Sequence, residues 1–250
     1  MVDAVRVSTD VGYLWLPTSD QVILTYMQSA GTWEEAEGQL LRSLLKPTSR
    51  FLDVGANVGY FSALAAKCSP AGTIDAVEPE PRSLALLRFN LWALAPHAKI
   101  WPLALGHSRG VAALQVEANN PGNTRVNVDH TLATQLAVTA RGDELFDGRT
   151  FDVIKIDVQG FETDVISGLQ GVLKRSENAC MVVEFFPEAI VDRGQQPLDA
   201  LRLYRSMGLD RVVNLEGKLL RLSEEEILSV CSRSGRAGYV NLVLRKQRTE

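Results

Sequence analysis

The sequence has little cysteine, little histidine and no long apolar run. Its 250 residues include three cysteines and three histidines. Cys68, Cys180 and Cys231 lie far apart and form no C-x-x-C pair, so their spacing indicates neither a disulfide framework nor a zinc site. We therefore expect these cysteines to be buried free thiols.

The chain also lacks a strong positive charge, since it has 30 acidic and 26 basic side chains and a formal net charge of −4. Surfaces that neutralise nucleic-acid phosphates are usually strongly basic, so we expect no nucleic-acid partner. Nowhere do about 18 apolar residues follow one another, and the first ten residues, which include Asp3 and Asp10, lead into no signal-like apolar run. These absences predict a cytoplasmic protein with no membrane partner, and they leave its oligomeric state open.

The composition that remains is that of a globular domain, with 46% hydrophobic residues. Short apolar runs alternate with helical patterns, which is typical of βαβ units around a parallel sheet. Thr32, followed by Glu35, predicts a capping box at the start of an early helix. The pattern predicts strands at residues 50–54, 73–77, 99–105, 151–156 and 179–185, helices at 58–67, 81–94 and 160–173, a hairpin at 211–222 and a last strand at 238–244.

The segment FLDVGANVGY at residues 51–60 places an aspartate at the end of a predicted strand and two glycines in the loop that opens the next helix. The backbone at Gly55 and Gly59 can approach a ligand without obstruction by a Cβ atom. Glu78 ends the next predicted strand, where a carboxylate can accept hydrogen bonds from both hydroxyls of a ribose. These features predict a cofactor that contains a nucleoside.

The glycine spacing discriminates between two such cofactors. A dinucleotide fold prefers G-x-G-x-x-G, whereas the glycines here are four apart and Asp53 stands just before them. A carboxylate in that place would repel a pyrophosphate and suits a cofactor with cationic groups. S-adenosylmethionine, which carries a sulfonium and an ammonium group, therefore fits the loop better than NAD.

Four motifs together resemble the FkbM-type methyltransferase family. They are DVGANVG at residues 53–59, VEPEP at 77–81, Asn90-Leu91, and IKIDVQGFE at 154–162, in the order and spacing of the family. The resemblance covers roughly residues 30–210. It implies a Rossmann-like class I methyltransferase fold, which is a single α/β domain with a doubly wound, mostly parallel, seven-stranded sheet and a reversed last strand.

The resemblance also implies S-adenosylmethionine as the methyl donor and a hydroxyl oxygen of a small molecule, a sugar or a natural-product intermediate, as the acceptor. We expect residues 46–250 to form the methyltransferase core and residues 1–45 to contribute to the acceptor pocket. Residues 106–133 show no clear period and are rich in asparagine and glycine. We expect them to be an irregular insertion that serves as a lid and becomes ordered when ligands bind.

Individual roles for the cofactor-binding residues follow from the same resemblance. Glu34 matches a glutamate that precedes the core of the family, and Asp157 sits at the mouth of the fourth strand. The expected cofactor contacts are Asp53, Gly55, Asn57 and Gly59 at the methionine end, Glu78 at the ribose with Pro79 in the same motif, Ala104 and Leu105 beside the adenine, and Glu34 and Asp157 near the cofactor.

An aliphatic hydroxyl becomes a good nucleophile only when a nearby base takes its proton. The candidates are Asp157, Glu184, which emerges from an apolar strand at its carboxyl end, and His130, which follows Asp129 in the expected lid. For Asp157 a helix N-cap is an equal alternative. Gln159 stands where the family commonly has glutamate, so the proton-acceptor or metal role of that position is in doubt.

Lys155 lies in a buried strand and must reach a carboxylate or the end of the sheet, although a pair with Asp157 is not expected. A divalent metal is possible but not indicated, because Asp157 and Glu184 alone supply too few ligands. Other functions stay open. They are an NAD(P)-dependent oxidoreductase, a cofactor-binding module without catalysis, and a nucleobase aminomethyltransferase, whose Asn/Asp-Pro-Pro-aromatic turn is replaced here by residues 157–160.

Overall fold

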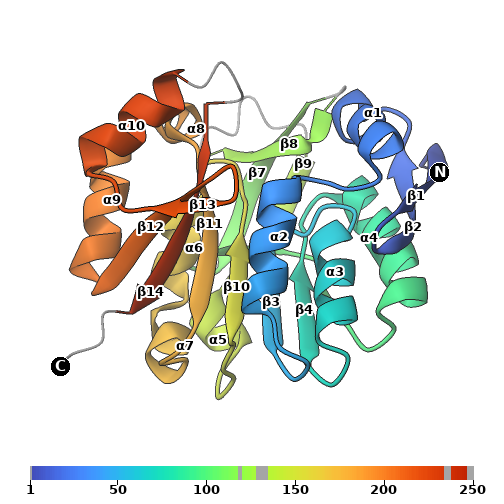
Figure 1. The fold of residues 1–250 in the computed structure, drawn as a ribbon, viewed down its shortest axis with the longest axis horizontal. Coiled ribbons are helices and arrows are strands. Elements are labelled where there is room, and N and C mark those ends of the chain that lie inside the picture. The colour runs from blue at the N-terminus through green and yellow to red at the C-terminus, as the bar shows by residue number, and fades with distance from the viewer. Residues whose placement is uncertain (1, 118–119, 128–134, 234–237, 247–250) are drawn as a thin grey trace.

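A computed structural model describes residues 2–117, 120–127, 135–233 and 238–246, and its elements surround one large sheet (Figure 1). Within that part of the chain the sheet has eight strands. In spatial order they are β13 (Lys218–Leu220), β12 (Leu209–Leu215), β14 (Val240–Lys246), β11 (Cys180–Phe185), β10 (Val153–Ile156), β3 (Arg50–Val54), β4 (Thr73–Val77) and β5 (Lys99–Trp101).

The strand directions confirm the predicted class I arrangement. β5, β4, β3, β10 and β11 are parallel, while β14 pairs antiparallel with both β11 and β12. The last strand is therefore reversed and lies between two strands of the other direction. The terminal hairpin adds the short β13 as an eighth strand at the edge.

Both faces of the central strands are covered, which is why β10 and β11 are buried along their whole length and read as continuous apolar runs. Alternate residues belong to different cores: Phe51 and Val153 pack in one, Leu52 and Ile154 in the other. Two charged side chains, Asp53 and Lys155, alternate with these residues and therefore share the face of Phe51 and Val153. Two buried charged side chains on neighbouring strands therefore lie on the same face of the sheet.

The N-terminal half of the chain covers that face (Figure 1). Its elements are the hairpin β1 (Ala4–Thr9) and β2 (Gly12–Pro17), followed by α1 (Gln21–Ala30), α2 (Glu35–Leu44), α3 (Tyr60–Cys68) and α4 (Pro81–Leu94). The opposite face packs against α5 (Gly142–Leu145), α6 (Glu162–Gly168), α7 (Gln170–Arg175), α8 (Pro187–Asp192), α9 (Pro197–Ser206) and α10 (Glu224–Arg233). The doubly wound layering is therefore confirmed.

A second sheet corrects two expectations. It contains β6 (Ala104–Gly106), β9 (Gln135–Arg141), β7 (Gly110–Glu117) and β8 (Asn120–Asn127). The single strand expected at 99–105 is thus two strands in two sheets, separated at Pro102 and Leu103. The expected irregular insertion is wrong for residues 110–117 and 120–127, whose small and polar residues hid a hairpin with antiparallel pairing. Residues 128–134, which include Asp129 and His130, lie outside the described residues.

Two local expectations also fail. Thr32 does not cap α2, because its hydroxyl hydrogen-bonds to the hydroxyl of Tyr60 at 2.7 Å and the N-cap residue is Glu34, with no side-chain cap bond. The helix expected at 160–173 is divided at Leu169 into α6 and α7. The three cysteines are free, and two of them are buried. No helix in the described part of the chain combines the length and apolar character needed to cross a membrane.

Candidate active site

The site lies where the chain changes its direction of travel across the sheet. From β3 the chain proceeds outward to β4 and β5, and it later returns to the other side of β3 to form β10 and β11. Ligands in open α/β sheets bind at the carboxyl ends of strands at such a point. The loops after β3, β4 and β10 meet there, because Gly55 and Ala56 donate backbone hydrogen bonds to Val77 and Asp157 donates one to Val54, each at 3.0 Å.

Gly55 allows these loops to come together. Its φ is +83°, and a Cβ atom built on it would lie 1.8 Å from the carbonyl oxygen of Asp157. The sequence suggested that this glycine leaves room for a ligand. The structure adds a second requirement for glycine, because the space that a side chain would need is filled by the backbone after β10.

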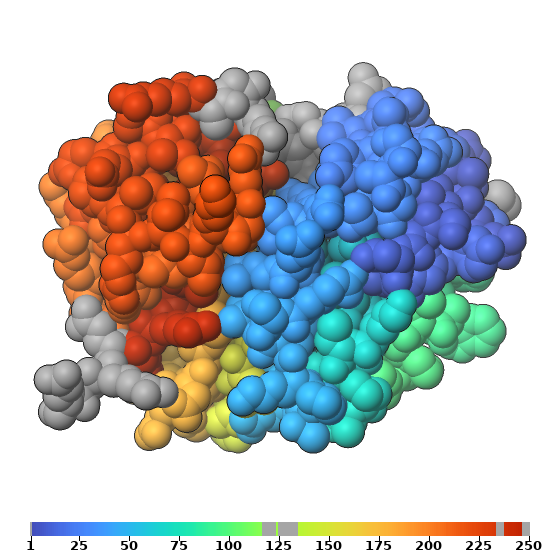
Figure 2. Space-filling view, viewed as in Figure 1, coloured from blue at the N-terminus to red at the C-terminus, as the bar shows by residue number. Residues whose placement is uncertain are grey.

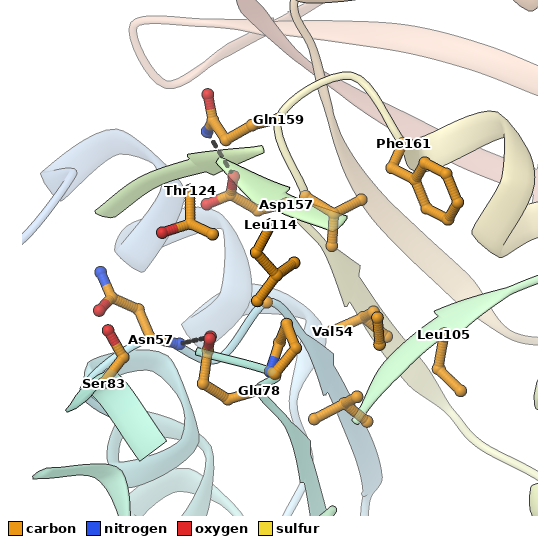
Figure 3. Close-up of a pocket in the computed structure, with 15 residues that line it drawn as sticks. Val54, Asn57, Glu78, Ser83, Leu105, Leu114, Thr124, Asp157, Gln159 and Phe161 are labelled. Atoms are coloured by element: carbon orange, nitrogen blue, oxygen red, sulfur yellow. Dashed lines mark hydrogen bonds between the residues drawn. The ribbon is translucent and has the colours of Figure 1, made fainter. Parts of the chain in front are cut away.

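A narrow cavity opens at this junction (Figure 3). Its walls are mostly apolar, with the polar atoms of Asn57 and Glu78 on one side and those of Asp157 and Gln159 on another. The lining residues are Val54, Gly55, Asn57, Val77, Glu78, Pro79, Ser83, Ala104, Leu105, Leu114, Thr124, Asp157, Val158, Gln159 and Phe161. Apolar walls with a few convergent polar groups are typical of small-molecule and cofactor pockets.

Glu78 is one of two acidic residues in the described lining of this narrow cavity, the other being Asp157. Its two carboxylate oxygens accept hydrogen bonds from the backbone N–H groups of Asn57 and Glu80, both at 2.8 Å. Burial raises the pKa of Glu78 to about 7, against the opposing effect of these two hydrogen bonds. The carboxylate therefore both holds the loop before α3 and presents its remaining lone pairs to the cavity.

A second, wider cavity of about 1290 Å³ adjoins the first. It lies between the N-terminal helices α1 and α2 and the elements that follow β11, which form neighbouring blue and orange-red regions in Figure 2. The two cavities share Asn57, Asp157 and Gln159. These three side chains therefore stand at the passage from one cavity to the other.

Gln159 joins two carboxyl groups at that passage. Its side-chain amide donates to Asp157 Oδ1 at 3.0 Å and to Glu184 Oε2 at 2.7 Å. The residue takes the left-handed conformation, with φ of +51°. The next helix, α6, begins at Glu162 with no side-chain cap bond, so the N-cap alternative for Asp157 is wrong.

Lys155 holds the other side of Asp157. Its Nζ donates to Asp157 Oδ2 at 2.9 Å, lies 3.9 Å from Glu37 Oε1 and stands 4.7 Å from the centre of the Phe61 ring. The expectation that Lys155 would not pair with Asp157 was wrong, because Asp157 lies beyond the end of β10 and its carboxylate turns back toward the strand. Only 1% of Lys155 is exposed, so the pair is shielded from solvent.

Asp157 and Glu184, the two carboxyl groups joined by Gln159, differ in proton affinity. Burial alone would raise the pKa of Asp157, but the adjacent Lys155 ammonium holds it below its ordinary value. Burial raises the pKa of Glu184 well above its ordinary value, and the negative charge of Asp157 adds to this effect. At neutral pH Asp157 is therefore ionised, whereas Glu184 has the higher affinity for a proton.

Further acidic groups line the wider cavity. Glu34 Oε1 accepts a hydrogen bond from the hydroxyl of Tyr239 at 2.9 Å, and Glu37 Oε2 accepts one from the side chain of Asn241 at 3.1 Å. Burial and the neighbouring Glu34 carboxylate raise the pKa of Tyr239. Sequence reasoning missed Glu37, Tyr239 and Asn241, because these contacts join segments about 200 residues apart.

The sequence-predicted residues separate into three groups. Gly55, Asn57, Glu78, Pro79, Ala104, Leu105 and Asp157 line the narrow cavity, and Glu34 and Glu184 line the wider one. Asp53 and Gly59 are not among the described residues that line either cavity. Asp53 accepts a hydrogen bond from Ser62 at 2.6 Å beneath α3, and Gly59, with φ of +94°, packs against Leu87. His130 lies outside the described residues.

In the described part of the chain, no group of three or more His, Cys, Asp or Glu side chains has the arrangement of a metal site. The donor set instead fits a cationic nucleoside. A carboxylate stands in an apolar cavity that would accept an adenosine, and the ionised Asp157 stands where a sulfonium and an ammonium group would follow.

Comparison with known proteins identifies the family. Residues 53–208 match the model of the methyltransferase FkbM domain, which is more than half of the chain. The chain belongs to the FkbM methyltransferase family. This is a family of S-adenosylmethionine-dependent enzymes, and the predicted family and cofactor are thereby confirmed.

Two curated relatives of this FkbM domain are methyltransferases. One is methyltransferase sdnD of Sordaria araneosa, 31% identical over 162 residues that cover 63% of this chain and 56% of the relative. The other is the hexuronic acid methyltransferase AglP of Haloferax volcanii, 29% identical over 147 residues that cover 55% of this chain and 58% of the relative. The chain thus spans a little over half the length of these relatives.

A solved structure shares the fold. It is a SAM-dependent O-methyltransferase from Thermotoga maritima, which matches with a TM-score of 0.51 at 14% sequence identity and covers 98% of this chain and 79% of its own. At that identity the likeness concerns the arrangement of the sheet and helices alone.

Proposed function

We propose that this FkbM domain transfers a methyl group from S-adenosylmethionine to a hydroxyl oxygen of a small molecule. The observation that carries the proposal is the junction of two unlike cavities at Asp157, with Glu184 beside it. When bound, the cofactor supplies a methyl group on a positively charged sulfur. The protein's part is to align the acceptor oxygen with that methyl group and to remove the hydroxyl proton.

The narrow cavity would hold the adenosine. Glu78 is placed to accept hydrogen bonds from the ribose hydroxyls, and Pro79, Ala104 and Leu105 supply apolar walls for the adenine. Asp157 lies at the opposite end of this cavity, where its charge would attract the sulfonium. The acceptor would then occupy the wider cavity, whose walls include residues of the N-terminal segment 1–45.

Glu184 is the proposed general base. A useful base needs a proton affinity higher than that of an ordinary carboxylate, and burial together with Asp157 gives Glu184 such an affinity. Asp157 is a weaker base, because Lys155 stabilises its ionised form. Gln159 keeps the Glu184 carboxyl group at the passage between the cavities by its 2.7 Å hydrogen bond.

The hairpin of β7 and β8 contributes Leu114 and Thr124 to the narrow cavity. This placement supports a role for the hairpin as a cover over the cofactor, in place of the irregular lid that the sequence suggested. Amide hydrogen exchange of residues 110–117 should slow when S-adenosylhomocysteine binds. Equal exchange rates with and without the ligand would remove this part of the proposal.

Calorimetric titration with S-adenosylhomocysteine, NAD and NADP tests the cofactor assignment. We expect binding of S-adenosylhomocysteine only, whereas binding of either dinucleotide would favour the oxidoreductase alternative. Release of S-adenosylhomocysteine from S-adenosylmethionine is then measured with a set of hydroxylated small molecules, in which sugars are included because one relative is a hexuronic acid methyltransferase. Cofactor binding without release for any acceptor would favour a non-catalytic module.

A further inference from the structure

The wider cavity is strongly acidic. Its described lining residues include no lysine, arginine or histidine, and its carboxyl groups come from both halves of the chain. They are Asp20, Glu34, Glu35, Glu37, Asp157, Glu184, Glu188 and Glu216. Carboxyl groups that surround a cleft add their fields inside it and favour a positively charged occupant.

Some of these carboxyl groups already have a role. Asp157 is paired with Lys155, Asp20 caps α1 by accepting the Ile23 N–H at 3.0 Å, and burial raises the pKa of Glu37 well above its ordinary value. Three further glutamates are exposed at the mouth of the cavity. They have no proposed part in binding the cofactor or in removing the hydroxyl proton. Glu35 begins α2, Glu188 lies in α8 and Glu216 forms the turn between β12 and β13, so three separate elements supply negative charge.

Two asparagine side chains of the cavity wall are fixed by hydrogen bonds within the protein. Asn214 donates its side-chain N–H to the carbonyl of Ala36 at 3.3 Å, and Asn241 donates to Glu37. The side-chain oxygens of both asparagines are buried and have no hydrogen-bond partner, and Asn214 is only 7% exposed. These oxygens are shielded from solvent, so the two amides shape the wall, while the carboxyl groups supply its charge.

Aromatic rings complete the wall. Tyr26 and Trp33 meet edge to face with their centres 5.4 Å apart, and Phe186 and Tyr239 lie 6.3 Å apart on the other side of the cavity. Aromatic faces attract cations and pack against the C–H groups of sugar rings. The wall is therefore suited to a molecule that has both apolar surface and positive charge.

We propose that the methyl acceptor carries a protonated amine as well as the hydroxyl that is methylated, as in an amino sugar. The inference rests on the proposed function, because it takes the wider cavity as the acceptor site. An acceptor with a carboxylate would meet the glutamates at the mouth with like charge. A neutral sugar could occupy the cavity but would gain nothing from that charge.

The test uses the full chain saturated with S-adenosylhomocysteine and four sugars: a hexosamine, its N-acetyl derivative, the parent hexose and the hexuronate. Ligand-observed NMR gives their affinities. We expect the hexosamine to bind at least about threefold more tightly than the hexose or the N-acetyl sugar, and the hexuronate to bind least tightly. This preference should weaken as salt is added, because exposed charges are screened.

Two variants test whether the preference for the hexosamine depends on charge at the mouth of the wider cavity. Glu188→Gln removes one exposed charge at the mouth and should weaken hexosamine binding about threefold while leaving hexose binding unchanged. Glu177→Gln removes an exposed charge just before β11, at the amino end of that strand, whereas the cavities lie at the carboxyl ends of the strands. It should change neither the hexosamine affinity nor the hexose affinity. Absence of hexosamine binding, equal or tighter binding of the hexose or hexuronate, or an equal effect of the two variants overturns the inference. Failure to bind S-adenosylhomocysteine would instead overturn the proposed function on which it rests.

Discussion

The two cavities that meet at Asp157 are built in opposite ways. The narrow cavity has mostly apolar walls, which come from the loops after β3, β4 and β10 together with β6 and the hairpin of β7 and β8, and its carboxyl groups are Glu78 and Asp157. The wider cavity has many carboxyl groups and is assembled from α1, α2 and the segments after β11, which are distant in the sequence. Backbone contacts between loops bring the walls of the narrow cavity together, whereas carboxyl side chains dominate the walls of the wider one.

This difference teaches where each part of the site is vulnerable. A change in the narrow cavity should act through the backbone and alter folding or cofactor affinity. A change in the wider cavity should leave the fold and the cofactor affinity intact and alter turnover or acceptor choice. The following variants test that division.

Gly55→Ala should destabilise the protein by roughly 4 kcal/mol, because the new Cβ would overlap the Asp157 carbonyl oxygen at a residue with positive φ. Chemical denaturation followed by circular dichroism measures the loss. Gly194→Ala is the matched control, since Gly194 also has positive φ, +73°, but no atom within 4 Å of the added Cβ. A loss equal to that of the control, about 1 kcal/mol, would refute the steric explanation.

Glu184→Gln should lower turnover at least about 100-fold, which corresponds to roughly 2.7 kcal/mol, and should change the affinity for S-adenosylhomocysteine less than about twofold. The amide keeps the shape of the side chain but cannot take the hydroxyl proton. Turnover is measured by S-adenosylhomocysteine release with an accepted hydroxyl compound, and affinity by calorimetry. Glu177→Gln should retain the turnover of the natural chain. Full activity of Glu184→Gln would exclude Glu184 as the base.

Glu78→Gln should weaken S-adenosylhomocysteine binding by about 2 kcal/mol, because a neutral amide replaces the carboxylate that we propose accepts hydrogen bonds from the ribose hydroxyls. Glutamine can still accept the N–H of Asn57 or Glu80, so the loop before α3 should persist. The natural chain should bind more tightly as the pH rises through about 7, where Glu78 becomes ionised, and the variant should not. Calorimetry over this range decides, and identical pH profiles would contradict the ribose assignment.

Glu162→Gln should change the pH dependence of stability. The carboxylate accepts hydrogen bonds from Val158 at 3.2 Å and Gly160 at 3.0 Å, and burial raises the pKa of Glu162 to about 7. Its folded-state pKa exceeds the unfolded value of about 4.5, so the folded state retains a proton that the unfolded state has lost, and stability falls as the pH rises from about 4.5 to 7.

The variant lacks this titration. It should match the natural chain near pH 4.5 and become relatively more stable, by about 1–2 kcal/mol, above pH 7. Urea denaturation at several pH values measures the difference. A difference that stays constant across the range would show that Glu162 titrates normally.

Much of the fold could be predicted from the sequence, because local patterns specify the parallel strands. The apolar runs at β3, β10 and β11 predict central strands that are buried on both faces, and the resemblance supplied their order. The small sheet could not be predicted in this way. The alternation in β7 and β8 involves small and polar residues such as Ala112 and Thr124, and its hydrophobic signal is weak.

The candidate site, like the fold, could be predicted only in part from the sequence. Gly55, Glu78 and Asp157 were found because each stands at a strand end within a local motif. The contacts of Glu37 with Lys155 and of Tyr239 with Glu34 could not be found, because they depend on how α2 and β14 pack across the sheet. Lys155 itself was recognised as a buried charge, but its partner depends on the direction in which the chain leaves β10.

Among the residues that the structure describes, only Asn57, Asp157 and Gln159 belong to both cavities, and this has a consequence for how such enzymes can diversify. The remaining walls of the wider cavity come from residues 20–39 and 184–241, which contribute nothing to the described lining of the narrow one. Apart from Glu37 and Glu184, which contact Lys155 and Gln159, substitutions in those two segments should be able to accumulate with little effect on the narrow cavity. A chimera that exchanges them between two family members should inherit its acceptor preference from the donor of the segments and its cofactor affinity from the recipient.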